Sequence, residues 1–188
     1  MSKRSVTYLA LSIGAALFVS VFFVLSPALQ AEAPQFVGAA KCKMCHKAEY
    51  ESWMATAHAK AFDKLKPEQQ KDAKCIKCHT TGFGKAQAEG SELQGVQCEG
   101  CHGAGSLYKS ATNIMNKAKW TADPKGQRKL AVEAGLTDKI DETLCKTCHN
   151  PESPTFESFD FAKAHPKIQH KPSAPAAATE KPKTETGK

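Results

Sequence analysis

The chain lacks the sequence pattern of a β-sheet, since no segment shows a sustained alternation of apolar and polar residues. Half-buried strands need that alternation because successive side chains point to opposite faces of the sheet. The sequence therefore predicts little or no β-structure. It also lacks a recognisable nucleophile or acid–base pair, so an enzyme with its own substrate domain is the weaker hypothesis.

Clustered positive charge is lacking as well. Lys and Arg number 26 against 19 Asp and Glu, but the lysines are spread along the chain and no nucleic-acid motif occurs. We therefore expect no nucleic-acid partner. Residues 171–188 contain no aromatic or large aliphatic side chain and are rich in Pro, Ala and Lys. With nothing to bury, they are predicted to be a disordered tail.

Residues 1–33 have the organisation of an export signal. Lys3 and Arg4 precede an uncharged apolar run over residues 6–25, and small-x-small cleavage sites follow it. The apolar run is longer than a usual signal core and approaches the roughly 20 residues that span a bilayer. The segment is therefore either a cleaved signal peptide or an N-terminal membrane anchor. In both cases the rest of the chain lies outside the cytoplasm.

All eight cysteines fall in C-x-x-C pairs, and a histidine follows every pair directly. The motifs are Cys42-x-x-Cys45-His46, Cys75-x-x-Cys78-His79, Cys98-x-x-Cys101-His102 and Cys145-x-x-Cys148-His149. This is the attachment signature of c-type haem. Two cysteines three residues apart lie on one side of a helical turn, so their sulfurs can reach both vinyl groups of one porphyrin. The adjacent histidine then becomes the proximal iron ligand. The sequence predicts four haem c groups.

Two other uses of paired cysteines compete with this interpretation. Four pairs could form two zinc sites, and an exported protein could form disulfides. Neither needs a histidine after every pair. With haem, a domain over residues 34–170 would wrap four porphyrins, which predicts a mostly α fold with extensive loops. The helical periodicity and stop signals predict helices at 49–65, 107–119 and 125–134.

Three histidines of the exported part lie outside the motifs. His58 falls in a row at intervals of four residues with Tyr50, Met54 and Phe62, so it shares the apolar face of the predicted helix. That face would pack on porphyrin, which makes His58 a candidate distal ligand, for a haem other than that of His46.

His165 and His170 follow the last motif, and each is a further candidate distal ligand. Four haems with histidine on both faces would need four spare histidines, and only three are present. At least one iron is therefore open, bound by a histidine of a neighbouring chain, or bound by a methionine, which would raise its potential. The candidate methionines are Met44, Met54 and Met115.

Longer segments surround these motifs. They are Val37-Gly38, Trp53 with His58-Ala59-Lys60-Ala61-Phe62, Cys75–Gly84, Gly95–Ser106, the string CKTCHNPESP from Cys145, and Ile168-x-His170. Taken together, they resemble the multihaem cytochrome c-554 family between Phe36 and His170. The resemblance implies a tetrahaem fold of helices and loops with closely packed haem pairs, which passes electrons in the periplasm. It also implies that His58 ligates a haem other than the first.

The resemblance implies that the best-known members, from ammonia oxidisers, accept electrons from hydroxylamine oxidation and keep one open haem. This chain departs from them, because it has no spare histidine between His79 and Cys98 or between His102 and Cys145. Some distal ligands must therefore differ, and the hydroxylamine partner is not carried over.

The sequence predicts a periplasmic tetrahaem cytochrome, soluble or anchored to the inner membrane through residues 6–25. It would transfer electrons between respiratory partners, such as a quinol-oxidising membrane enzyme and a terminal reductase of anaerobic respiration. Two alternatives stay open. One is a haem enzyme acting on a small nitrogen oxide or hydroxylamine at an open iron. The other is a subunit of a homo-oligomeric haem wire.

Overall fold

The computed structural model describes residues 32–110 and 112–170. The chain divides into two units, residues 1–32 and 33–188, and every element described below belongs to the second. Apart from residues 32 and 33, the predicted export segment lies outside the described residues, as does the predicted tail. Within the described ranges, no helix is both long and apolar enough to cross a bilayer.

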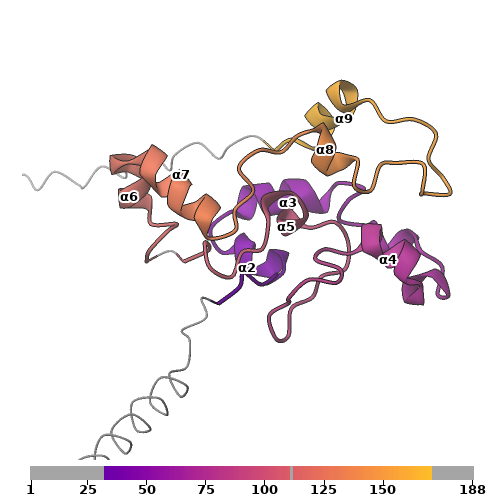
Figure 1. Cartoon of the computed structure of the whole chain (residues 1–188), viewed down its shortest axis with the longest axis horizontal. Coiled ribbons are helices and arrows are strands. Elements are labelled where there is room, and N and C mark those ends of the chain that lie inside the picture. The colour runs from indigo at the N-terminus through magenta and orange to yellow at the C-terminus, as the bar shows by residue number, and fades with distance from the viewer. Residues whose placement is uncertain (1–31, 111, 171–188) are drawn as a thin grey trace, which may run out of the picture. The chain divides into compact units, whose positions relative to one another are not determined.

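The fold consists of short helices joined by long loops (Figure 1). The α-helices are α2 (Ala39–Lys43), α3 (Lys47–Met54), α4 (Ala73–His79), α5 (Cys98–His102), α6 (Lys117–Ala122), α7 (Pro124–Glu133), α8 (Glu142–Cys145) and α9 (Phe161–Ile168), and the 3₁₀-helices are η1 (Phe62–Lys64) and η2 (Gln69–Lys71). Helix α2 contacts both α3 and α5, while α6 and α7 pack on each other. The contact between α2 and α5 brings the first and third attachment motifs together from distant parts of the chain.

Five of the eight α-helices named above begin at a capping side chain. Asp72 accepts a hydrogen bond from the Lys74 amide at 2.8 Å, and Asp141 accepts one from the Leu144 amide at 3.1 Å. The same arrangement starts α6, α7 and α9. Such a cap satisfies an amide that has no partner within the helix. The caps fix where α4 and α8 begin, and so where the second and fourth motifs lie.

Regular β-structure is absent from the described residues, as predicted. Two isolated bridges occur instead, a parallel one between Phe36 and Gln87 and an antiparallel one between Thr80 and Gln94. The second bridge belongs to a longer contact, since the Thr81 amide donates to Leu93 O at 2.8 Å and the Gly95 amide donates to His79 O at 3.0 Å. Residues 93–97 therefore run beside the end of the second motif.

The predicted helix at 49–65 is wrong beyond Met54. The Thr56 hydroxyl donates to Trp53 O at 2.7 Å and accepts from the Ala59 amide at 3.3 Å, so it competes with the helical pattern of backbone bonds. Turns follow, and only residues 62–64 are again helical, as η1. The four-residue row through His58 therefore does not lie on one continuous helix.

The predicted helix at 107–119 is also wrong over most of its length. Residues 106–109 and 112–115 form turns, and α6 starts only at Lys117, after the Asn116 cap. The predicted helix at 125–134 is confirmed as α7. Its end is fixed by Gly135, whose φ of +103° suits glycine better than any other residue.

The polypeptide buries few of its own apolar side chains. Among the described residues, the buried ones are Val37, Ala39, Leu93, Ala104, Tyr108 and Ala131. Buried polar residues join them, namely Thr81, Gln97 and Glu99. Phe83, Met54 and Leu130 stay more than 40% exposed, and Met44 is 82% exposed. A chain that buries so little apolar surface has a small hydrophobic driving force of its own. This agrees with an interior made largely of cofactor.

Candidate functional site

Each of the four motifs lies on a helical turn. The second motif ends α4 and the third coincides with α5. In the first motif, the turn is completed by a bond from the His46 amide to Cys42 O at 2.9 Å. In the fourth, the His149 amide donates to Cys145 O at 3.0 Å. Both sulfurs and the histidine of each motif therefore share one helical turn, as haem attachment requires.

The eight cysteines are free thiols. Within residues 32–110 and 112–170, no three His, Cys, Asp or Glu side chains gather closely enough to hold a metal ion on their own. The two alternatives from the sequence, zinc sites and disulfides, therefore have no matching arrangement among the described residues. The cysteines are instead available for thioether bonds.

Two histidines far apart in the sequence face each other. The ring centroids of His58 and His149 lie 6.0 Å apart, with the planes inclined by 54°. Two imidazoles that bind one metal ion from opposite sides, each through a bond of about 2 Å, have centroids roughly 6 Å apart. Burial lowers the pKa of His58, and His149 lowers it further, which favours the neutral imidazole that binds metal. The pair fits the axial ligands of a haem attached at the fourth motif.

The backbone around His58 is held by residues 95–97. The Trp53 indole donates to Val96 O at 2.8 Å, and the Val96 amide donates to His58 O at 2.9 Å. Gly95 permits this approach, because its φ is +82° and a Cβ there would lie 2.7 Å from Ala59 O. His58 is thus fixed by contacts with the segment that leads into the third motif, and not by a helix as the sequence predicted.

A second pair of imidazoles has nearly the same geometry. The ring centroids of His102 and His170 lie 5.8 Å apart, with the planes inclined by 41°. Burial lowers the pKa of His102, and the neighbouring His170 adds to the effect. The His102 carbonyl accepts a bond from the Thr137 amide at 2.9 Å, which ties α5 to the loop after α7. This pair fits the axial ligands of a haem at the third motif.

The two remaining motif histidines have other partners. His79 Nδ1 lies 2.5 Å from Ala61 O, and His46 Nδ1 lies 4.0 Å from a carboxylate oxygen of Glu49. A metal-binding histidine commonly uses one ring nitrogen for such a carbonyl or carboxylate and the other for the metal. His79 has this arrangement and His46 approaches it. The ring contacts of the described residues pair neither of them with another imidazole.

His165, the third spare histidine, stacks on Phe161 within α9, with centroids 4.9 Å apart and planes inclined by 16°. Its ring contact is therefore with its own helix and not with a motif histidine. Another aromatic contact was not anticipated from the sequence: Phe159 stacks on His149 with centroids 4.7 Å apart. Phe159 has no signal in the sequence beyond being apolar near the last motif.

The thiols show which motifs are neighbours. The Cys42 thiol donates a hydrogen bond to the Cys98 sulfur, which raises the pKa of Cys42 and lowers that of Cys98. Burial raises the pKa of Cys78 to about 11, and a hydrogen bond to Cys148 contributes to the shift. The first motif therefore adjoins the third, and the second adjoins the fourth.

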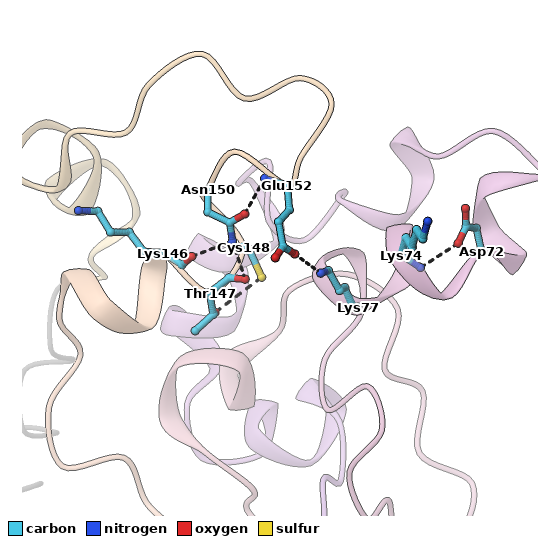
Figure 2. Close-up of polar contacts among 8 residues, drawn as sticks. All are labelled: Asp72, Lys74, Lys77, Lys146, Thr147, Cys148, Asn150 and Glu152. Carbon is cyan, nitrogen blue, oxygen red and sulfur yellow. Dashed lines mark hydrogen bonds and ion pairs between the residues drawn. The ribbon is translucent and has the colours of Figure 1, made fainter.

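A further contact joins these two pairs of motifs. Burial raises the pKa of Cys101 to about 11, with a smaller contribution from Cys145, so the third and fourth motifs are also close. The second and fourth motifs have an additional connection. Figure 2 shows Lys77 of α4 and Glu152 of the loop after the fourth motif pointing toward each other as an ion pair. The four motifs thus follow one another in space as first, third, fourth and second.

Three buried polar side chains lie between the motifs. The Gln97 side-chain oxygen accepts a bond from the Ala39 amide at 2.6 Å, and the Gln97 backbone amide donates to Thr81 Oγ1 at 2.7 Å. Glu99 accepts bonds from the Val37 and Gly38 amides. Sequence reasoning missed all three, although Glu99 stands inside the third motif string, CEGCH, where it could have been noticed.

These attachment turns, facing imidazoles and short helices define a multihaem c-type cytochrome. The profile of the family described as cytochrome c554 and c-prime matches residues 41–103. Cytochrome c-554 of Nitrosomonas europaea is 34% identical over 160 residues, which span 73% of this chain and 67% of that protein. The solved structure of reduced cytochrome c554 from the same organism covers 75% of this chain and 80% of its own at 30% identity, with a TM-score of 0.48.

The chain belongs to the cytochrome c-554 family, which confirms the resemblance found in the sequence. It is an electron-transfer cytochrome with covalently bound haem c, and its partners are redox proteins.

Proposed function

We propose that the chain carries four haem c groups and relays electrons between respiratory partners in the periplasm. When bound, each haem iron supplies one reversible ferric–ferrous step. The four attachment turns support the count, because each offers two sulfurs and one histidine to a separate porphyrin. In this proposal residues 34–170 form the tetrahaem domain, residues 1–33 direct export, and residues 171–188 are an extension.

The two facing imidazole pairs carry the proposal most directly. His149 and His58 would be the axial ligands at the fourth motif, and His102 and His170 those at the third. Both separations match two nitrogens bound to one metal ion from opposite sides. Histidine on both faces would keep the iron six-coordinate in both oxidation states, so little rearrangement would accompany electron transfer.

His46 and His79 would be the proximal ligands at the first and second motifs, each without an imidazole opposite. The seven histidines are then fully assigned, with His165 bound to no iron because it stacks on Phe161. We propose that the sixth position at these two motifs has no histidine. This differs from a single open haem and follows from the missing spare histidines noted in the sequence.

The proposed relay follows the spatial order of the motifs. The contacts between Cys42 and Cys98, and between Cys78 and Cys148, bring sulfurs of successive haems together. The row then runs from the first motif through the third and fourth to the second. Its two inner members are those with paired histidines, and its two ends are the points of exchange with a donor and an acceptor.

A quinol-oxidising membrane enzyme and a terminal reductase are the proposed donor and acceptor. The periplasmic location is supported by the similarity to cytochrome c-554 and by the export signal in the sequence. Attachment to the membrane through residues 6–25 would keep the protein beside a membrane-bound donor. The electron-carrier hypothesis is favoured over the nitrogen-oxide enzyme because the family is one of electron-transfer cytochromes.

Two measurements on the purified protein test this proposal. The intact mass should exceed that of the mature polypeptide by four haem groups, and electron paramagnetic resonance of the oxidised protein should show two low-spin irons of histidine–histidine type. A mass increase of two haems or fewer would overturn the tetrahaem count. Three bis-histidine signals from a monomer would contradict the ligand assignment, while four such signals per chain from an oligomer would support the haem-wire alternative.

A further inference from the structure

Glu99 is the largest side chain that is fully buried in the described part of the chain, at 2% exposure. It lies on α5, inside the third attachment motif. Its carboxylate accepts four hydrogen bonds, two from the Val37 amide at 3.0 Å, one from the Gly38 amide at 2.8 Å and one from the Gly105 amide at 2.7 Å. A glutamate buried this deeply inside a short cofactor-binding motif requires a physical reason.

The hydrogen bonds favour the ionised form of Glu99. Both oxygens accept from amide N–H groups, whereas a protonated carboxyl would direct its own O–H toward one of these donors. All the donors are neutral backbone amides, so they stabilise the negative charge without cancelling it. Glu99 is therefore a fixed negative charge in a water-poor region, where electrostatic interactions are much stronger than in solvent.

This charge lies between the first and third motifs. Val37 and Gly38 lead into α2, which carries Cys42, and Gly105 lies in the loop that leaves the third motif. The charge of Glu99 contributes to the raised pKa of Cys42, after the larger effects of the Cys98 hydrogen bond and burial. It also contributes to the raised pKa of Tyr108, after burial. Arg128, whose charge acts on His102 in the same motif as Glu99, is paired with Asp138 at 3.3 Å.

We propose that the negative charge of Glu99 lowers the reduction potentials of the haems at the first and third motifs relative to those at the second and fourth. The inference rests on the proposed tetrahaem function. A nearby negative charge stabilises the ferric porphyrin, which is more positive than the ferrous one by one charge. Electrons then pass from the pair beside Glu99 toward the pair at Cys78 and Cys148, which gives the relay a direction.

The test compares two substitutions in the full-length holoprotein. Glu99→Gln keeps the length of the side chain and removes the charge, whereas Glu99→Asp keeps the charge and shortens the side chain. Glu92→Gln removes an exposed carboxylate from the same region and is the control. Each protein is titrated potentiometrically, with optical and paramagnetic resonance spectra to separate the haems, and its intact mass gives the number of haems.

In Glu99→Gln, we expect two of the four haems to become easier to reduce, with about a tenfold change in the reduced-to-oxidised ratio, or about 59 mV for one electron. The potentials of the other two haems in Glu99→Gln should stay close to those of the unsubstituted protein. All haem potentials in Glu99→Asp and Glu92→Gln should do the same. Equal shifts in all four haems, no shift in Glu99→Gln, or equal shifts in Glu99→Gln and Glu99→Asp would overturn the proposal.

The test can still be made if Glu99→Gln does not yield a haem-loaded protein. Glu99→Asp is then compared with the unsubstituted protein alone, and raised potentials at two haems despite the retained charge would overturn the proposal. Failure of the tetrahaem function is recognised separately, because the unsubstituted protein itself would then carry fewer than four haems by mass. A shift confined to the pair at the first and third motifs supports the assigned direction of transfer.

Discussion

Replacing His58 with alanine tests the most specific part of the site. The His58 ring centroid lies 6.0 Å from that of His149, and this separation leaves room for one iron and two bonds of about 2 Å. In the proposed assignment, removal of the His58 imidazole takes the distal ligand away from the iron at the fourth motif. We expect the low-spin bis-histidine irons to fall from two per chain to one, and the high-spin irons to increase by one, in the paramagnetic resonance spectrum of the oxidised protein.

His165→Ala is the matched control, because His165 is also a spare histidine but stacks on Phe161. It should leave the count of low-spin irons unchanged. The haem content of both variants by intact mass should equal that of the unsubstituted protein, since covalent attachment depends on the cysteines. If His58→Ala retains both low-spin signals, or if His165→Ala loses one, the pairing derived from ring positions is refuted.

Two further substitutions test the close backbone contact at Gly95 and the exposed ion pair of Lys77 with Glu152. Gly95→Ala should destabilise the holoprotein by about 1–2 kcal/mol from its positive φ alone, and more because the new Cβ would press on the backbone beside His58. Chemical denaturation checks this, with Gly90→Ala as control, since its φ is +68° and no atom lies within 4 Å of its Cβ position; equal losses in the two variants would contradict the role given to the close contact. Lys77→Gln removes the ion pair with Glu152 between the second and fourth motifs, so the melting temperature should depend less on added salt than in the unsubstituted protein. A salt dependence that does not change would mean that the pair contributes nothing.

The attachment chemistry could be predicted from the sequence because it depends on local spacing. A cysteine, a second cysteine three residues later and an adjacent histidine form one helical turn whatever surrounds them, and the described motifs all have this form. The end of α7 at Gly135 and the absence of strands from the described residues are local in the same sense. These features required no knowledge of which segments meet in space.

The path of the chain around His58 could not be predicted in this way. Its periodic row indicated one long helix, but α3 ends at Met54, where the Thr56 hydroxyl competes for backbone bonds. His58 is then positioned by Val96, 38 residues further along the chain. Periodicity reports which residues would share a face if the helix continued, and it carries no information on such long-range backbone bonds.

Which spare histidine faces which motif histidine could not be predicted from the sequence either. Nothing in the spacing of His165 and His170 distinguishes the residue that stacks on a phenylalanine from the one that faces His102. The role of Glu99 depends on three amides from two other segments, and these come together only in the folded chain.

The scarcity of buried apolar side chains has a consequence for how this protein is made. A polypeptide that encloses only six of them, within the part that the structure describes, gains too little from collapse to offset the entropy of ordering its long loops. Before its thiols have reacted, the chain should therefore remain extended and open to proteases. Each porphyrin that is attached would then supply part of the interior on which the next segment can pack.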